Sequence, residues 1–142
     1  MLVADILKSK GTDIFSVTSD ESVVTAIALL CTKKIGAVLV MDGQGDIQGI
    51  LSERDLIRAM NTHGKSLFEK KVGELMTTEV VTCSPQDPIA AIMGMMTAQR
   101  FRHVPVINEG RMVGMISIGD VVKSRIEEAQ SEVEALRLYI SL

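Results

Sequence analysis

The sequence is poor in aromatic residues, and this shortage argues against one class of partner. Aromatic side chains make up 3% of the 142 residues and tryptophan is absent. Domains that bind single-stranded nucleic acid usually stack bases on such side chains. The formal net charge of −3 also argues against a broad surface for a phosphate backbone. We therefore expect no nucleic-acid partner, although these values leave room for a local basic pocket that holds one or two phosphates.

Cysteines, histidines and long apolar runs are also scarce. Cys31 and Cys83 lack CxxC spacing, which argues against a disulfide framework and a zinc site. Two histidines without an acidic cluster argue against a catalytic metal. No run approaches the roughly 18 apolar residues of a membrane helix, and the first residues do not resemble a signal peptide. These features predict a cytoplasmic protein with reduced thiols, no metal and no membrane partner.

The sequence does contain a pattern of about 60 residues that occurs twice. Val72 to Met76 repeats the pattern of Val3 to Leu7, and Val38 corresponds to Val104, which lies 66 residues later. After the hairpin turn the offset falls to 65, because one residue is missing from the second turn, where a deletion is tolerated. Each repeat is expected to form a strand, a helix, two strands and a second helix.

Periodicity and turn residues place these elements along the chain. Thr18 with Glu21, and Ser84 with Asp87, are predicted to be capping boxes that start the first helix of each repeat. Pro85 would then occupy the first helical position. The expected strands are 14–17, 37–41, 47–51, 80–83, 104–107 and 112–116, and 8–13 is expected to be a loop. The helix after Ser52 is expected to bury Leu56, Ile57 and Met60.

Both hairpins end in the motif Gly-apolar-apolar-Ser-x-x-Asp. The first copy has Ser52 and Asp55, and the second has Ser117 and Asp120. A helix start offers N–H groups and a positive dipole to a phosphate, and an aspartate can accept hydrogen bonds from both hydroxyls of a ribose. The glycine three residues before each serine is predicted to let a ligand approach the backbone closely. The alternative is that each box only caps its helix.

Three cationic or titratable side chains are candidates for phosphate contacts: Arg54, Arg102 and His103. Arginine suits bidentate contact with phosphate. The two repeats differ here, because Gly119 replaces Arg54 and Gly36-Ala37 replaces Arg102-His103. Two sites of unequal affinity are therefore expected. The alternative is that the arginines are solvated and that His103 packs at a strand start.

Together, these motifs resemble a tandem pair of CBS domains, also called a Bateman module, over about Val3 to Ser124. The resemblance implies an α/β fold of two pseudo-symmetric β-α-β-β-α repeats packed through their sheets. It implies an adenine nucleotide, AMP, ADP, ATP, NAD(H) or S-adenosylmethionine, in clefts between the repeats. The aspartates would hold ribose and the serines phosphate, while adenine would lie near Val17 and Thr82. The predicted boundaries are 7–66 and 76–133 for the repeats and 126–142 for a helical extension.

The C-terminal extension carries a separate pattern. Its apolar residues recur with spacings of 4, 3, 4, 3 and 4, which is typical of a coiled-coil face. Such a helix is expected to pack on a partner or on a second subunit of a homodimer, and the alternative is that it folds back on its own chain. The residues of this stripe are Val122, Ile126, Ala129, Val133, Leu136 and Ile140.

The resulting functional hypothesis is a regulatory module without catalysis or a required cofactor. It would bind AMP, ATP or NAD(H) and modulate a partner protein, whose identity the sequence does not specify. The first alternative is an interaction scaffold that works without a ligand. The second is an enzyme, but the chain has neither a Gly-x-Ser-x-Gly elbow nor a zinc motif, so no enzymatic activity is expected.

Overall fold

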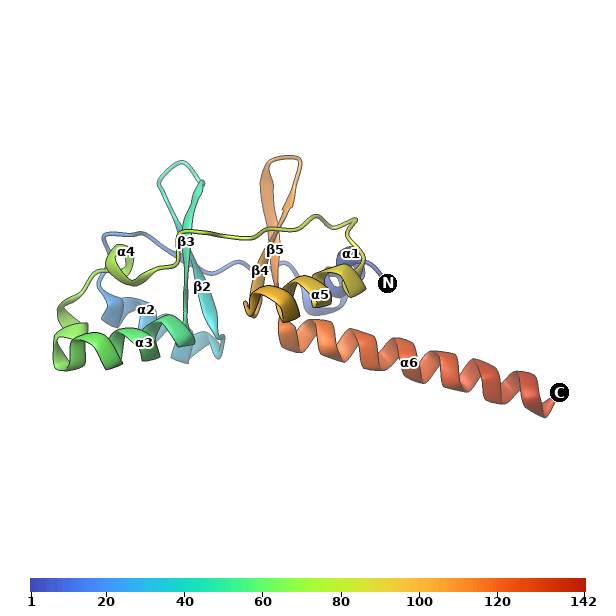
Figure 1. The fold of residues 1–142 in the computed structure, drawn as a ribbon. Helices are drawn as coiled ribbons and strands as arrows, with labels where there is room; N and C mark the ends of the chain where they lie inside the picture. Colours follow the sequence, from blue (N-terminus) through green and yellow to red (C-terminus); the bar gives the residue numbers. More distant parts are fainter. The chain divides into compact units, whose positions relative to one another are not determined.

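The computed structural model describes residues 1–142 and shows small β-sheets flanked by helices (Figure 1). The expected α/β class and long C-terminal helix are confirmed. The chain forms two compact units, of which one is Ile14–Val80 and the other joins Met1–Asp13 to Val81–Leu142. No helix combines the length and the apolar character needed to cross a membrane.

The unit Ile14–Val80 contains a three-stranded sheet. Strand β1 is parallel to β2, and β2 is antiparallel to β3. Residues 37–40 of β2 are all buried, and Val38 and Val40 pack in one cluster with Leu30 of α2. The elements are β1 (Ser16–Val17), α2 (Val23–Lys33), β2 (Ala37–Met41), β3 (Ile47–Ser52), α3 (Glu53–His63), the 3₁₀ helix η1 (Gly64–Glu69) and α4 (Val72–Leu75).

The other unit contains the antiparallel pair β4-β5. Its buried cluster includes Val104 and Ile116 from the sheet and Ile92 from a helix. Cys83 forms an isolated parallel bridge to Val106, where the sequence predicted a strand over 80–83. The elements are α1 (Val3–Lys10), α5 (Ile89–Gln99), β4 (His103–Asn108), β5 (Arg111–Ser117) and α6 (Ile118–Ser141).

The two hairpins have the same internal register, as the sequence repeat predicts. Val40 lies opposite Gly49 in one, and Val106 lies opposite Gly114 in the other. An irregularity follows directly after Val40 and after Val106. In each hairpin the second strand has one extra residue at this point, as in a β-bulge, and that strand ends at the serine that starts the next helix.

Helix α1 packs in the unit of the second repeat, not with the first repeat that follows it in sequence. Val3 N–H donates to the carbonyl oxygen of Asp87 over 3.0 Å, and Val3, Ile6 and Leu7 are all buried in the same cluster as Ile116. Its sequence counterpart α4 contributes Val72 to the cluster of the other unit. Each repeat is therefore completed by the short helix that precedes the other repeat in the sequence pattern.

Two predicted capping boxes are wrong. The Glu21 carboxylate does accept from Thr18 N–H, and the Asp87 carboxylate accepts from Ser84 N–H. Both bonds close a turn ahead of the helix, because the N-cap residues are Ser22 for α2 and Pro88 for α5. Pro85 is accordingly outside the helix. A serine or threonine with an acidic residue three positions later can close a single turn as well as start a helix. The sequence pattern alone therefore does not distinguish a turn from a helix start.

The apolar face predicted for α3 is also wrong in part. Ile57 and Met60 are 67% and 55% exposed, whereas Asp55 and Ala59 are buried. Asp55 must point inward to bond with the serine that caps the helix. This bond sets the rotation of α3 about its axis, so Ala59, four positions after Asp55, lies on the same inward face. The loop predicted over 8–13 also begins later, because α1 continues to Lys10.

Candidate functional site

The first Ser-x-x-Asp motif forms a closed capping box at the start of α3. Ser52 has an extended backbone (φ −111°, ψ 166°) that continues from β3. Its N–H and its Oγ donate to Oδ2 of Asp55 over 2.9 and 3.0 Å. In return, Asp55 N–H donates to Ser52 Oγ over 3.3 Å. Ser52 and Asp55 thus cap the start of α3.

The second motif has the same geometry at the start of α6. The N–H and Oγ of Ser117 donate to Oδ2 of Asp120 over 2.8 and 3.0 Å, and Asp120 N–H donates to Ser117 Oγ over 3.2 Å. The backbone is again extended at the serine (φ −106°, ψ 165°). Each unit therefore presents one helix N-terminus at which a serine and an aspartate are bonded to each other.

The two aspartates differ in their third partner. Thr77 Oγ1 donates to Oδ1 of Asp55 over 2.9 Å, and a nitrogen of Arg58 lies 4.0 Å from the same oxygen. Thr77 is held there by backbone bonds in both directions with Ile50 of β3. Both oxygens of Asp55 thus accept hydrogen bonds, and the residue is only 9% exposed.

At the second motif the third partner is a cation. Lys10 Nζ lies 2.6 Å from Oδ2 of Asp120 and also donates to the carbonyl oxygen of Met115 over 2.9 Å. Partial burial raises the pKa of Asp120, but the bonds from Lys10 and Ser117 outweigh it and hold the pKa below its ordinary value of 3.8. Asp120 is therefore a carboxylate at neutral pH with an ammonium group beside it.

A cavity of about 160 Å³ lies next to this ion pair, between α1 and α6. Its lining includes Lys10, Asp120 and Lys123. It is formed entirely within the unit that joins the two ends of the chain.

The glycines of the motifs serve a different contact from the one predicted. A Cβ atom on Gly49 would lie 2.6 Å from the carbonyl oxygen of Thr77, and one on Gly114 would lie 2.7 Å from Cδ2 of Leu7. Both positions are filled by the chain itself, and both glycines are buried. The glycines therefore make room for the segment after α4 and for α1, not for a ligand.

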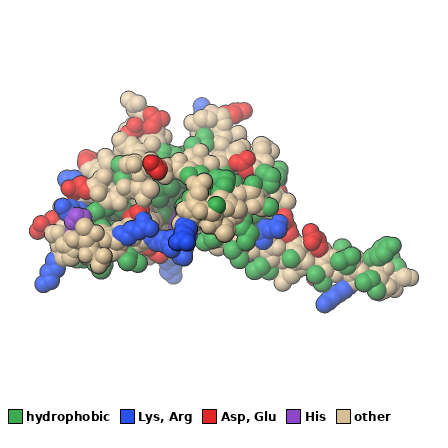
Figure 2. Space-filling view, in the orientation of Figure 1, with side chains coloured by type: hydrophobic (Ala, Val, Ile, Leu, Met, Phe, Trp, Pro, Cys, Tyr) green, Lys and Arg blue, Asp and Glu red, His purple; other side chains and the backbone are tan.

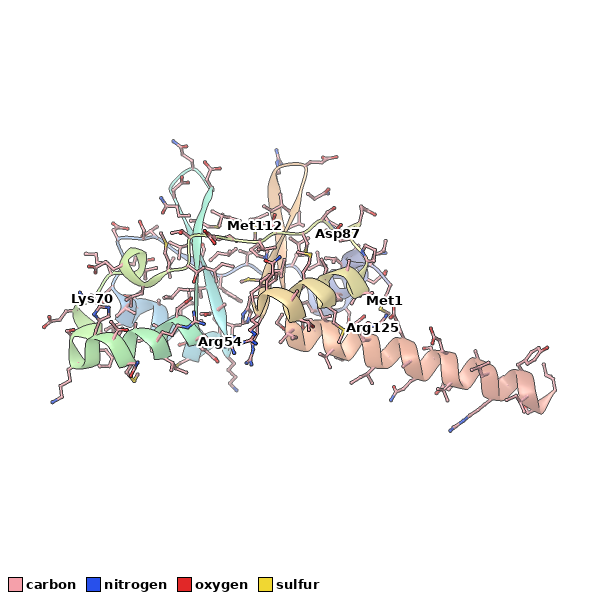
Figure 3. The ribbon with its side chains drawn as sticks, viewed as in Figure 1. Met1, Arg54, Lys70, Asp87, Met112 and Arg125 are labelled. Carbon is pink, nitrogen blue, oxygen red and sulfur yellow. The ribbon has the colours of Figure 1, made fainter.

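The predicted cationic residues lie near the serines in each unit. Arg54 is in the first turn of α3 (Figure 3) and is exposed. His103 is the first residue of β4 and lies opposite Ser117 in the sheet. Arg102 is exposed, and its carbonyl oxygen accepts from Ile118 N–H over 2.8 Å. The structure thus brings Arg102, His103, Ser117 and Asp120 into one unit.

Val17 and Thr82, the two residues predicted to lie near adenine, differ in their exposure to solvent. Val17 is 5% exposed, lies in β1 opposite Val40 and packs in the core, so only its backbone remains for a ligand. Thr82 is exposed and precedes the isolated bridge at Cys83.

Sequence reasoning missed Lys10 and Thr77. No spacing signal connects Lys10 with Asp120, which is 110 residues away. The one available signal was the repeat of Val3 to Leu7 at Val72 to Met76, which marks α1 and α4 as equivalent helices with equivalent neighbours.

One protein family matches this chain twice, once for each repeat. The model of the CBS domain family matches residues 3–62 and again residues 72–127. The mitochondrial CBS domain-containing protein CBSX3 of Arabidopsis thaliana is 36% identical over 97% of this chain and 71% of its own length. The crystal structure of the CBS-domain containing protein ATU1752 from Agrobacterium tumefaciens is 44% identical, with a TM-score of 0.86 over 88% of this chain and 99% of that chain.

A third relative was crystallised with ligands. The CBS domain pair of protein MJ0100, in complex with 5-methylthioadenosine and S-adenosyl-L-methionine, is 26% identical, with a TM-score of 0.76 over 92% of this chain and 98% of that chain. The two matched segments cover most of the sequence and coincide with the two copies of the motif. This chain belongs to the CBS domain family and carries two CBS domains.

Proposed function

We propose that the chain is a non-catalytic regulatory module that binds an adenosine-containing ligand, AMP, ADP, ATP or NAD(H), through its Ser-x-x-Asp motifs. The observation that supports this most directly is the recurrence of one geometry, a helix start where a serine and an aspartate are bonded to each other, at Asp55 and Asp120. The serine-aspartate pair does not recur at the other helix starts, because α1 and α4 have only the carboxylate bond to a backbone N–H and α2 and α5 start without either bond. The adenosine ligands of the MJ0100 domain pair support the same ligand class.

In this proposal Asp120 accepts hydrogen bonds from ribose hydroxyls and Lys10 faces a phosphate. The three hydrogen bonds that Asp120 accepts from Lys10 and Ser117 all reach its Oδ2 atom. A ribose hydroxyl would therefore bond to Oδ1 of Asp120. Ser117 supplies the helix N-terminus, where backbone N–H groups and the dipole favour an anion. Arg102 and His103 of the same unit add cationic or titratable groups.

The site at Asp55 is proposed to bind more weakly. A ribose there competes with Thr77 Oγ1, which already occupies Oδ1. Opening this bond costs free energy, because a buried carboxylate is left with fewer donors until the ligand supplies them. Arg54 and Ser52 would contact the phosphate. The proposed assembly is a homodimer that changes its affinity for a partner protein when the ligand binds.

Calorimetry on protein freed of nucleotide tests this proposal. AMP, ATP, NADH and S-adenosylmethionine are titrated separately, and saturable binding of at least one is expected. Asp120→Asn should weaken that binding at least tenfold. The asparagine side chain has an NH₂ group in place of one carboxylate oxygen, so it cannot accept a hydrogen bond from a ribose hydroxyl at that atom. The matched control is Asp87→Asn, which removes an equivalent carboxylate bond to a serine N–H, 2.8 Å long, in the same unit, and should leave affinity within about twofold.

Two results would contradict the proposal. One is the absence of heat with all four compounds, which would favour the ligand-independent scaffold. The other is an equal loss of affinity in the Asp87 and Asp120 variants, which would mean that the Ser-x-x-Asp box acts only as a cap.

A further inference from the structure

Helix α6 continues well beyond the part of the chain that defines the family. The family match ends at residue 127, whereas α6 runs to Ser141. Every residue from 129 to 142 is exposed, so this part of the helix does not fold back on its own chain. The fold-back alternative considered from the sequence is therefore not the one that the structure adopts.

The exposed part of α6 carries an apolar face, which we call the α6 seam. Figure 2 shows hydrophobic side chains along the outer end of this helix. Large members are strongly exposed: Ile126 is 53%, Val133 46%, Leu136 61% and Ile140 81% exposed. Exposed aliphatic side chains at regular spacing on a polar helix favour association over solvation. The seam consists of Val122, Ile126, Ala129, Val133, Leu136 and Ile140.

The residue types in the seam select one kind of association. Spacings of 4 and 3 place Ile126, Val133 and Ile140 at the a positions of a heptad and Val122, Ala129 and Leu136 at the d positions. Every a position is thus β-branched, and one of the three d positions, Leu136, is leucine. In parallel coiled coils β-branched residues at a, with leucine at d, favour two strands over three or four. We propose that α6 pairs with α6 of a second copy of this chain in a parallel, in-register, two-stranded coiled coil.

The flanking charges support the parallel orientation. In a parallel pair the g residue Glu132 lies beside the e residue five positions later on the partner, which is Arg137, so opposite charges meet. Within one helix these two residues are five apart and do not face each other. In a fully overlapping antiparallel pair, Glu132 would lie beside its own copy and Lys123 beside Arg137. Like charges would then meet along both flanks.

The length of the seam limits its strength. From Val122 to Ile140 it spans fewer than three heptads, or about 28 Å at 1.5 Å per residue. A coiled coil this short gives concentration-dependent association, and its contribution grows when other parts of the two copies are also held together.

Disulfide cross-linking tests the orientation directly. In full-length protein with Cys31→Ser, a cysteine is placed either at the seam, Leu136→Cys, or two residues further on at an outward position, Leu138→Cys. The remaining Cys83 is buried and its pKa is raised to about 12, so it reacts little. A parallel, in-register pair brings the two 136 positions together. Leu136→Cys should form covalent dimer at least tenfold faster than Leu138→Cys, and equal rates would overturn the proposal.

A charge exchange tests the register independently. Glu132→Arg and Arg137→Glu should each raise the dimer dissociation constant about three- to tenfold in sedimentation experiments, and the double variant should return it to within about twofold. The control Glu127→Arg with Arg137→Glu has the same net charge but no matched pair and should not recover. If the Glu132/Arg137 double variant recovers no more than this control, the parallel register is wrong.

Discussion

At the scale of single residues, the most informative contrast is between Asp55 and Asp120. Both accept bonds from a serine N–H and hydroxyl with nearly equal lengths. Thr77 adds a neutral hydroxyl to one, and Lys10 adds an ammonium group to the other. The two repeats thus share a scaffold and differ in how close a cation lies to the carboxylate, which is 2.6 Å for Lys10 and 4.0 Å for Arg58, so an anionic ligand should distinguish them.

The ion pair between Lys10 and Asp120 predicts a pH-dependent effect of Lys10→Met. Because the folded-state pKa of Asp120 lies below its ordinary value, this residue stabilises the fold above about pH 4, and the contribution is lost as pH falls through the folded pKa. Lys10→Met should therefore lower the free energy of unfolding by about 1 kcal/mol at pH 7 and by less at pH 3. Urea denaturation at both values measures the difference.

An NMR titration of the carboxyl carbon of Asp120 should show its pKa rising toward 3.8 in the same variant. Lys8→Met removes an exposed lysine from the same helix and serves as the control, with no change in the titration of Asp120. An unchanged pKa in Lys10→Met would show that the ion pair is not formed in solution.

At the scale of elements, the close approach of short segments to β3 and β5 decides how the units are built. The segment after α4 bonds to Ile50 and passes over Gly49, and Leu7 of α1 lies over Gly114. In both cases a side chain on the strand would collide with the covering segment. The atom that a new Cβ would meet differs between the two positions. At Gly49 it is the backbone carbonyl oxygen of Thr77, and at Gly114 it is the end of the flexible Leu7 side chain.

This difference predicts unequal effects of alanine at the two glycines. Gly49→Ala should destabilise by about 2 to 3 kcal/mol, because the backbone of Thr77 must shift to relieve the overlap. Gly114→Ala should cost about 1 kcal/mol, since Leu7 can rotate away. Thermal or urea unfolding of both variants measures the order. Gly43→Ala, where a Cβ meets nothing within 4 Å, is the control, and equal costs at positions 49 and 114 would contradict the explanation.

Elements whose signal is local could be predicted from the sequence. Strand β2 has the predicted bounds, Ala37–Met41, because a short apolar run between a helix end and a glycine turn has few alternative structures. The starts of α2 and α5 were misplaced, because Ser84 with Asp87 forms the same bond in a turn as in a cap. The partners of the two aspartates could not be predicted, because Lys10 reaches Asp120 only through tertiary packing.

At the scale of the whole molecule, the two units are not consecutive in sequence. Met1–Asp13 belongs with Val81–Leu142, whereas Ile14–Val80 is one continuous segment. Core substitutions in the two short helices should therefore act on different parts of the chain. Leu7 of α1 and Val72 of α4 are both buried, each in the cluster of its own unit.

Hydrogen exchange can test this assignment with a matched pair of variants. Leu7→Ala should cost about 2 to 4 kcal/mol and reduce amide protection in β4, β5 and α5, because it leaves a cavity in their core. Val72→Ala should instead reduce protection in β2 and β3. Reduced protection in β2 and β3 on Leu7→Ala, with β4 and β5 unchanged, would contradict the division into units.

The position of α1 has a consequence for synthesis on the ribosome. Residues Met1–Asp13 leave the exit tunnel before the segment Ile14–Val80, but their binding surface on β5 is made only after that whole segment. At translation rates of about 5 to 20 residues per second, α1 waits roughly ten seconds with its apolar side chains uncovered. The continuous segment Ile14–Val80 can fold during that interval. The unit Ile14–Val80 is therefore expected to form before α1 packs on β5.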